Sequence, residues 1–200
     1  MPVAFLLVNE RLIKLLNFKN AGQPGQVRTE QQLYHGYIFD LVQRQIKTPD
    51  QMMVTRDVIL HRPAVAILAL TDKQQVVVNS EYRAGVNQES IALPAGLLNE
   101  NEDVTTAAAR ELSEETGYVA HDLQVLTTVA SSEGFTDERV TLVLAHVHAN
   151  EKVATNFDTD EFVNSQLVPL ADLIALIKTG TVQSAQTVAA VSYYLAFCQQ

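Results

Sequence analysis

Four glutamates and one arginine near the middle of the chain have side chains suited to a divalent-cation site. They are Glu102, Arg110, Glu111, Glu114 and Glu115. Carboxylates crowded in this way raise one another's pKa and destabilise a fold unless a cation neutralises them. Hard oxygen ligands suit Mg2+, which keeps several waters and binds substrate phosphates. The cluster therefore predicts a magnesium site that acts on a phosphorylated substrate.

A short helix is expected to position these side chains. Val104, Ala108 and Leu112 recur every four residues, which is the spacing of one buried stripe on a helix. Asp103 can cap the start of the helix, and Gly117 can adopt the left-handed conformation that ends it. We therefore expect a helix of about three turns between these two residues.

On such a helix the carboxylates share one face. Glu111 and Glu115 lie about 40° apart, and Glu114 lies about 60° to the other side of Glu111. Arg110 precedes Glu114 by four residues and can pair with it. A solvated acidic face is the ordinary interpretation of a glutamate run. The flanking glycines, the arginine and the apolar register favour the metal site instead.

The composition indicates a soluble globular protein with one sizeable domain and appendages. The chain has 200 residues, of which 47% are hydrophobic. Its longest apolar run, residues 64–70, is too short to cross a bilayer, and the N-terminal AFLLV lacks the flanks of a signal peptide. We therefore expect a cytoplasmic protein with no membrane partner. A net charge of −9 argues against nucleic acid as a partner, whereas divalent cations would bridge this charge to a phosphorylated substrate.

Apolar patterns and turn residues predict a mixed sheet with helices on its faces. Residues 33–61, with a turn at Pro49 and Asp50, are expected to form a small antiparallel sheet. Such a sheet buries little apolar area and needs a partner surface. A hairpin is expected at residues 64–70 and 75–82, followed by two strands at residues 123–131 and 140–149. Two helices are expected at residues 170–178 and 182–198. Residues 1 to about 27 have no clear role.

Two histidines, His146 and His148, superficially suggest a second metal site. They would project from the same face of one strand. No third ligand is evident in the sequence, so surface or packing histidines are expected.

The segment from Gly96 to Tyr118, GLLNENEDVTTAAARELSEETGY, resembles the complete Nudix box of the Nudix hydrolases. The segments YHGYIFDLVQRQI, SEYRAG, LPAG and GFTDE are similar to the ADP-ribose pyrophosphatase branch of that family. The resemblance implies an α/β (α+β) fold, namely the Nudix α/β/α sandwich with a mixed sheet, plus the small N-terminal antiparallel sheet. It also implies a homodimer that exchanges residues 1–62 between subunits, with a Nudix domain and C-terminal helices at residues 63–200.

By the same resemblance, the carbonyl of Ala95 and the side chains of Glu111 and Glu115 would bind Mg2+, with Mn2+ as the alternative. Glu114 and Glu102 would be further ligands or would support the ligands. Mg2+ would neutralise the substrate and activate a water.

The resemblance also implies two other catalytic residues besides Glu114, and an arginine that binds the substrate. Arg110 would orient the glutamates, and Arg83, at the end of a strand, would bind the diphosphate, although an ordinary surface charge is the alternative. Glu161 in an acidic loop would be the general base, with Asp160 as second choice and a solvated acidic loop as the alternative.

Aromatic rings and a glycine complete the substrate site that the resemblance implies. Tyr34, Tyr37 and Phe39 offer rings for stacking an adenine, although alternating aromatics in a strand also serve packing. Gly134 and Phe135 belong to the downstream loop of the branch.

The implied reaction is Mg2+-dependent hydrolysis of ADP-ribose, or a similar nucleoside diphosphate sugar, to AMP and a sugar phosphate. Two residues depart from the branch pattern: Glu133 stands where its loop usually has proline, and Ala92 where it often has an acidic residue. Another nucleotide sugar or a dinucleotide is therefore an alternative substrate. A non-catalytic Nudix-fold sensor is the alternative from another class, although a sensor needs no intact set of glutamates.

Overall fold

The computed structural model describes residues 22–156 and 163–199. The chain divides into two compact units, residues 1–60 and residues 61–200. Within the described residues, no helix is both long and apolar enough to cross a membrane.

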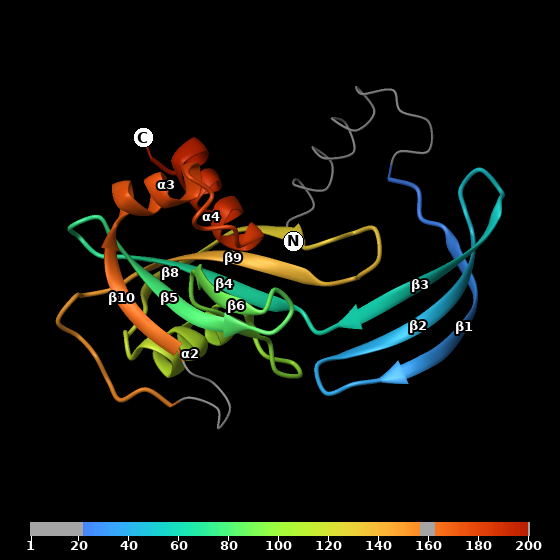
Figure 1. Cartoon of the computed structure of the whole chain (residues 1–200), viewed down its shortest axis with the longest axis horizontal. Helices are drawn as coiled ribbons and strands as arrows, with labels where there is room; N and C mark the ends of the chain where they lie inside the picture. The colour runs from blue at the N-terminus through green and yellow to red at the C-terminus, as the bar shows by residue number, and fades with distance from the viewer. Residues whose placement is uncertain (1–21, 157–162, 200) are drawn as a thin grey trace. The chain divides into compact units, whose positions relative to one another are not determined.

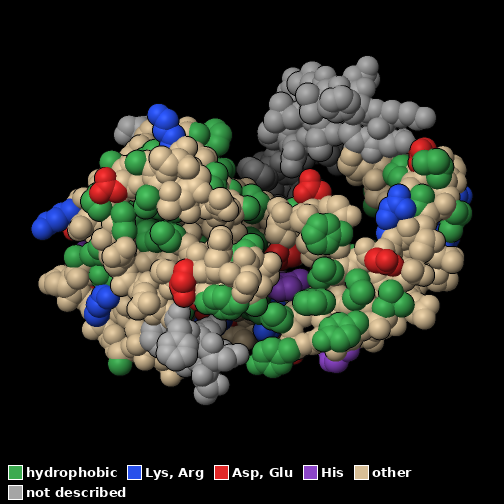
Figure 2. All heavy atoms as spheres, in the orientation of Figure 1, with side chains coloured by type: hydrophobic (Ala, Val, Ile, Leu, Met, Phe, Trp, Pro, Cys, Tyr) green, Lys and Arg blue, Asp and Glu red, His purple; other side chains and the backbone are tan. Residues whose placement is uncertain are grey.

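The first unit is a three-stranded sheet with the strand order β1-β2-β3. Its strands are β1 (Gln26–His35), β2 (Phe39–Lys47) and β3 (Met53–His61). Every residue of β1 is exposed, and Val42 is the single fully buried residue that the structure describes in this unit. Figure 2 shows several of its hydrophobic side chains at the surface. The predicted sheet is therefore confirmed, it starts earlier than expected, and it buries as little as the sequence indicated.

The second unit contains a seven-stranded mixed sheet with the order β10-β5-β4-β9-β8, to which β6 and β7 add at β5 and β4. The strands β4 and β9 are parallel, and the other pairs are antiparallel. The strands are β4 (Ala64–Leu70), β5 (Gln75–Arg83), β6 (Gln88–Ala92), β7 (Ala95–Leu97), β8 (His121–Ala130), β9 (Arg139–His146) and β10 (Val163–Pro169).

Helices cover both faces of this sheet (Figure 1). The helix α2 (Val104–Thr116) packs on one face, and α3 (Leu170–Lys178) and α4 (Ala185–Phe197) pack on the other. All seven residues of β4 are buried, and they alternate between the two hydrophobic cores. A continuous apolar strand is typical of a sheet that is covered on both faces. The predicted α/β/α sandwich with a mixed sheet is thus confirmed.

The hairpin of β4 and β5 opens where the box begins. Leu70 pairs with Val76 next to the turn, but farther along, β5 pairs with β6 and β4 pairs with β7. The N–H of Ile67 donates to the carbonyl of Pro94 at 2.8 Å. The segment that leads into the box is therefore held between the two strands as part of the sheet.

Four elements differ from the sequence prediction. The edge strand β10 and the short strands β6 and β7 were not predicted, and α4 spans residues 185–197 instead of 182–198. β10 reads VNSQLVP and has a weak strand pattern, because three of its seven residues are polar and lie next to one another. Its pairing with β5, more than 80 residues earlier in the chain, determines its conformation.

Candidate active site

The helix α2 has the ends that the sequence predicted. The Asp103 side chain accepts hydrogen bonds from the N–H groups of Thr105 and Thr106, and a bond from the Thr105 hydroxyl helps lower the pKa of Asp103. Gly117 ends the helix with φ of 74° and donates to the Ser113 carbonyl. A Cβ at Gly117 would lie 2.5 Å from the Val153 carbonyl oxygen, so both the backbone angle and the close approach require glycine.

Glu115 is the most deeply buried carboxylate among the candidate ligands, with an exposed fraction of 7%. One of its oxygens accepts a hydrogen bond from the Asn79 side chain at 2.8 Å and a longer one from the Ala95 N–H at 3.3 Å. The sequence linked Glu115 to Ala95 only through the resemblance. The structure brings the two residues into direct contact.

Glu111 lies against Gly96, the residue after Ala95. A Cβ placed on Gly96 would be 2.0 Å from the carboxyl carbon of Glu111, so any larger residue would displace this carboxylate. The side chain of Glu111 is 14% exposed. Two carboxylates of α2 therefore meet the main chain of β7 at neighbouring residues.

Arg110 connects the remaining glutamates. Its Nε and Nη2 atoms donate to the two carboxylate oxygens of Glu102, each at 2.8 Å, and Nη1 donates to Glu111 at 2.8 Å and Glu114 at 3.0 Å. Nη2 also donates to the Leu97 carbonyl at 3.1 Å. These bonds, chiefly those with Glu102, raise the pKa of Arg110. The bonds from Arg110, together with one from the Asn99 N–H, lower the pKa of Glu102 to about 2. Glu102 thus remains ionised at neutral pH.

Three carboxylates around one guanidinium, together with the Glu115 carboxylate on the same helix, leave an excess of negative charge in a partly buried place. Oxygen donors from carboxylates and a nearby main chain are the set that hard divalent cations prefer. Glu111 and Glu115 are little exposed, and their positions are fixed by hydrogen bonds from Arg110 and Asn79. The donor set therefore fits a divalent cation at the junction of α2 and β7.

The structure places Arg83 at the end of β5, on the same face as Asn79 and about 13 Å from it along the strand. Its guanidinium is 2.8 Å from a carboxylate oxygen of Glu81 and is 48% exposed. The guanidinium is therefore accessible to an anionic ligand, which would replace part of its contact with Glu81.

Gly134 and Phe135 lie in the loop between β8 and β9, and Phe135 is exposed. This loop adjoins the start of β9, where Val140 pairs with Ala64, and Ala64 in turn pairs with Leu97 of β7. The loop is thus at the same end of the sheet as the entry to the box.

The aromatic candidates belong to the first unit. Tyr34 and Phe39 flank the β1–β2 turn with their ring centroids 6.0 Å apart, and Tyr37 in the turn is fully exposed. The proposed base Glu161 and its alternative Asp160 lie outside the described residues.

Two supporting residues were missed in the sequence. Ser165 of β10 donates to the Asn79 side-chain oxygen at 2.7 Å and to the main-chain carbonyl of Glu115 at 3.2 Å. Asn79 is buried and completes the path from β10 to the Glu115 carboxylate. A polar residue directly after three valines in β5 was the signal that could have identified Asn79, because buried polar groups need partners.

The NUDIX domain family model matches residues 60–191 of this chain, which therefore belongs to the Nudix family. Within the family, the chain lies in the ADP-ribose pyrophosphatase-like branch and is a Nudix pyrophosphohydrolase. It is 33% identical over 164 residues to an ADP-ribose pyrophosphatase of Bacillus subtilis, covering 82% of this chain and 89% of that protein. It is 32% identical over 167 residues to a methanol dehydrogenase activator of Bacillus methanolicus, covering 84% and 90%.

A solved structure shows the same fold. The crystal structure of an ADP compounds hydrolase superposes with a TM-score of 0.76 and covers 88% of this chain and 94% of the other, at 21% sequence identity.

Proposed function

We propose that this Nudix hydrolase cleaves the diphosphate of ADP-ribose, or of a similar nucleoside diphosphate sugar, to AMP and a sugar phosphate with Mg2+ as cofactor. The observation that carries the proposal is the meeting of Glu111 and Glu115 at the Ala95–Gly96 main chain, with Arg110 and Asn79 fixing their positions. The similarity to the ADP-ribose pyrophosphatase of Bacillus subtilis supports the choice of substrate.

The proposed ligands of Mg2+, or of Mn2+ as the alternative, are Glu111, Glu115 and the carbonyl of Ala95. A bound ion would neutralise the diphosphate and lower the pKa of a water. Both carboxylate oxygens of Glu102 accept hydrogen bonds from Arg110, which favours a supporting role for Glu102 over direct coordination. The Glu114 carboxylate accepts a hydrogen bond from the same guanidinium and is more exposed, so Glu114 is the next candidate ligand.

The substrate contacts are proposed from position and charge. Arg83 would leave Glu81 and bind the diphosphate with two of its N–H groups. Gly134 and Phe135 would contact the sugar-phosphate end, because their loop adjoins the same end of the sheet as β7. Glu161, with Asp160 as the alternative, remains the proposed base from the resemblance alone.

The proposed homodimer, with residues 1–62 exchanged, is supported by the exposed apolar surface of the first unit. Its exposed apolar side chains include Leu33, Tyr34, Ile38, Met52 and Met53. Leu33, Tyr34 and Ile38 lie near the β1–β2 turn, whereas Met52 and Met53 lie at the other end of the sheet, and exposed apolar surface of this kind often marks an interaction site. Adenine stacking on Tyr34, Tyr37 or Phe39, and the cytoplasmic location, also remain predictions. Sedimentation of the protein as a monomer at micromolar concentration would contradict the dimer.

The test of the reaction is release of AMP and sugar phosphate from a panel of ADP-ribose, other nucleotide sugars and dinucleotides, each with Mg2+ and with chelator. Mg2+-dependent cleavage of ADP-ribose is the expected result. Cleavage of another compound alone would retain the mechanism and assign the specificity to the surroundings of Glu133 and Ala92. Binding of ADP-ribose without any cleavage would overturn the enzymatic proposal in favour of a sensor.

The metal assignment is tested by Glu115→Gln, which retains an oxygen to accept the Asn79 and Ala95 bonds. We expect the fold to persist and kcat to fall by orders of magnitude. The matched control is Glu100→Gln, because Glu100 is an exposed glutamate in the loop before α2. Near-normal turnover by Glu115→Gln would refute the assignment.

A further inference from the structure

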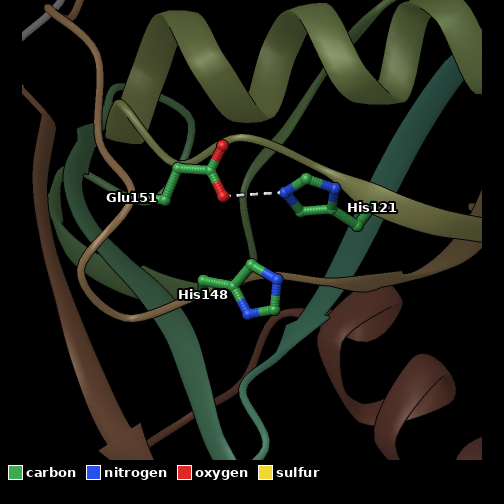
Figure 3. A group of neighbouring side chains, drawn as sticks. All are labelled: His121, His148 and Glu151. Atoms are coloured by element: carbon green, nitrogen blue, oxygen red, sulfur yellow. Dashed lines mark hydrogen bonds and ion pairs between the residues drawn. The ribbon is translucent and has the colours of Figure 1, made fainter.

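A second group of metal-ligating side chains lies away from the α2 glutamates. His121 from the start of β8 and His148 and Glu151 from the segment after β9 point toward one another (Figure 3). One ligand atom from each residue lies within 4.8 Å of the others. His121 Nε2 is 2.9 Å from Glu151 Oε2, and the two imidazole centroids are 4.9 Å apart. The sequence had suggested His146 and His148 as a pair without a third ligand, whereas the structure gives His148 different partners.

Main-chain hydrogen bonds fix the positions of all three residues. His121 is paired with His146 in the β8–β9 ladder, and the N–H of Glu151 donates to the carbonyl of His148 at 3.0 Å, which closes a turn. On both sides of this turn the chain is attached to the sheet and to the end of α2. Val147 donates to Leu70 at 2.9 Å, and Val153 donates to Gly117 at 2.8 Å. Only side-chain torsions therefore need to change for the three ligand atoms to converge.

The required change is small. Donor atoms around a tetrahedral zinc ion are about 3.4 Å apart, since each lies about 2.1 Å from the ion. The ligand atoms are now up to 4.8 Å apart, and rotation of the side chains can bring them to this separation. The side chains are free to rotate because His121 is 40% exposed, Glu151 43% and His148 51%. Asp72, in the β4–β5 turn, has an oxygen 3.9 Å from His148 Nδ1, so it can support this imidazole from the side that faces away from His121.

The neighbouring charges permit a cation here. Lys152 directs its amine at the face of the Tyr118 ring, 4.1 Å from the centroid. Asp72 adds negative charge beside His148 and is also 3.8 Å from His146 Nδ1. The ion pair of His121 and Glu151 is exposed and contributes little stability. It also does not explain why a second imidazole, that of His148, lies beside it.

We propose that His121, His148 and Glu151 form a binding site for a divalent transition-metal ion, with Zn2+ as the principal candidate. Two imidazoles and one carboxylate select Zn2+, Co2+ or Ni2+ over Mg2+, which prefers oxygen ligands. The bound ion would join the start of β8 to residues 147–153, which also bond to the end of α2. This proposal does not depend on the substrate of the Nudix site.

The test is a Co2+ titration of the untagged full chain carrying Glu111→Gln and Glu115→Gln, so that the two principal candidate ligands on α2 do not contribute. We expect one Co2+ per chain with visible d–d absorption, and displacement of Co2+ by Zn2+. Adding His148→Ala or His121→Ala should weaken Co2+ binding by at least about tenfold. The matched control is His35→Ala, because His35 is 79% exposed and pairs with Asp40 in the first unit. Equal Co2+ affinity in all of these variants would overturn the proposal.

A second measurement covers the case in which the doubly substituted chain does not fold. Unmodified protein in excess Mg2+ is titrated with Zn2+ while its imidazole C–H resonances are followed by NMR. The resonances of His121 and His148 should shift together at one equivalent, and those of His35 should not. Zn2+ that leaves the His121 and His148 resonances unchanged would overturn the site.

Discussion

Arg110 binds Glu102 through two parallel hydrogen bonds of 2.8 Å, which join the middle of α2 to the loop before it. The same guanidinium reaches Glu111, Glu114 and the Leu97 carbonyl. Such a planar fork serves five acceptor atoms at once, and an ammonium group cannot reproduce its geometry. The arginine therefore sets the spacing of the carboxylates that are proposed to bind the metal.

Arg110→Lys should lower kcat/KM by about tenfold or more and weaken the apparent affinity for Mg2+, although the charge is kept. A single ammonium cannot hold Glu102, Glu111 and Glu114 in their present places. The measurement is steady-state hydrolysis over a range of Mg2+ concentrations. Arg28→Lys is the control, because Arg28 is an exposed arginine of the first unit. Equal kinetics in both variants would show that charge alone is sufficient.

The Glu102–Arg110 pair should make the fold sensitive to acid. The folded state holds the pKa of Glu102 at about 2, below its ordinary value of 4.5, so the pair stabilises the protein above about pH 4.5. This stabilisation is lost as the pH falls from 4.5 toward 2, because Glu102 is then protonated. Urea unfolding in chelator at several pH values should show the loss, and Glu102→Gln should reduce the slope in this range. The control is Glu100→Gln. If Glu102→Gln and Glu100→Gln show the same dependence of the free energy of unfolding on pH, the acid sensitivity does not come from the Glu102–Arg110 pair.

Gly96→Ala should reduce turnover by at least about tenfold with little loss of fold. The new Cβ would lie 2.0 Å from the Glu111 carboxyl carbon, so the Glu111 side chain must rotate away and lose its present bond with Arg110. Circular dichroism measures whether the fold is kept, and steady-state hydrolysis measures kcat. Gly85→Ala is the control, since a Cβ at Gly85 meets no atom within 4 Å. A normal kcat in Gly96→Ala would show that hydrolysis does not depend on the present position of the Glu111 carboxylate.

Asn79→Ala should destabilise the protein by about 1–3 kcal/mol, because it removes a buried donor to Glu115 and an acceptor for Ser165. It should also weaken Mg2+ binding, since the Glu115 carboxylate loses the contact that directs it. Denaturant unfolding and metal titration test the two effects separately. Asn164→Ala, on the exposed neighbour of Ser165, should change neither quantity. Unchanged stability in Asn79→Ala would show that another group replaces its bond.

Local signals in the sequence were sufficient for α2. Asp103 and Gly117 act on residues within one helical turn of themselves, so both ends of the helix were predicted correctly. The same is true of α3, whose bounds agree with the prediction. The spacing within the helix also placed Glu111 and Glu115 on one face.

The contacts that support these glutamates were not predictable, because they join distant parts of the chain. Asn79 and Ser165 meet across 86 residues, through a pairing of β5 with the unpredicted strand β10. Nothing near Ser165 in the sequence specifies this partner. Likewise, Glu151 follows His148 by only three residues, but His121 reaches them through the β8–β9 ladder.

The buried side chain of Thr187 in α4 accepts a hydrogen bond of 2.9 Å from the N–H of Leu93, two residues before Ala95. The two residues are 94 positions apart. A ribosome makes the whole Nudix box well before it makes this contact or the β10 strand that carries Ser165. During synthesis, the nascent chain thus presents its glutamates before their final supports exist. The proposed metal site should therefore reach its final geometry only after α4 has left the exit tunnel and docked, so chains that lack α4 should lack a fully formed site.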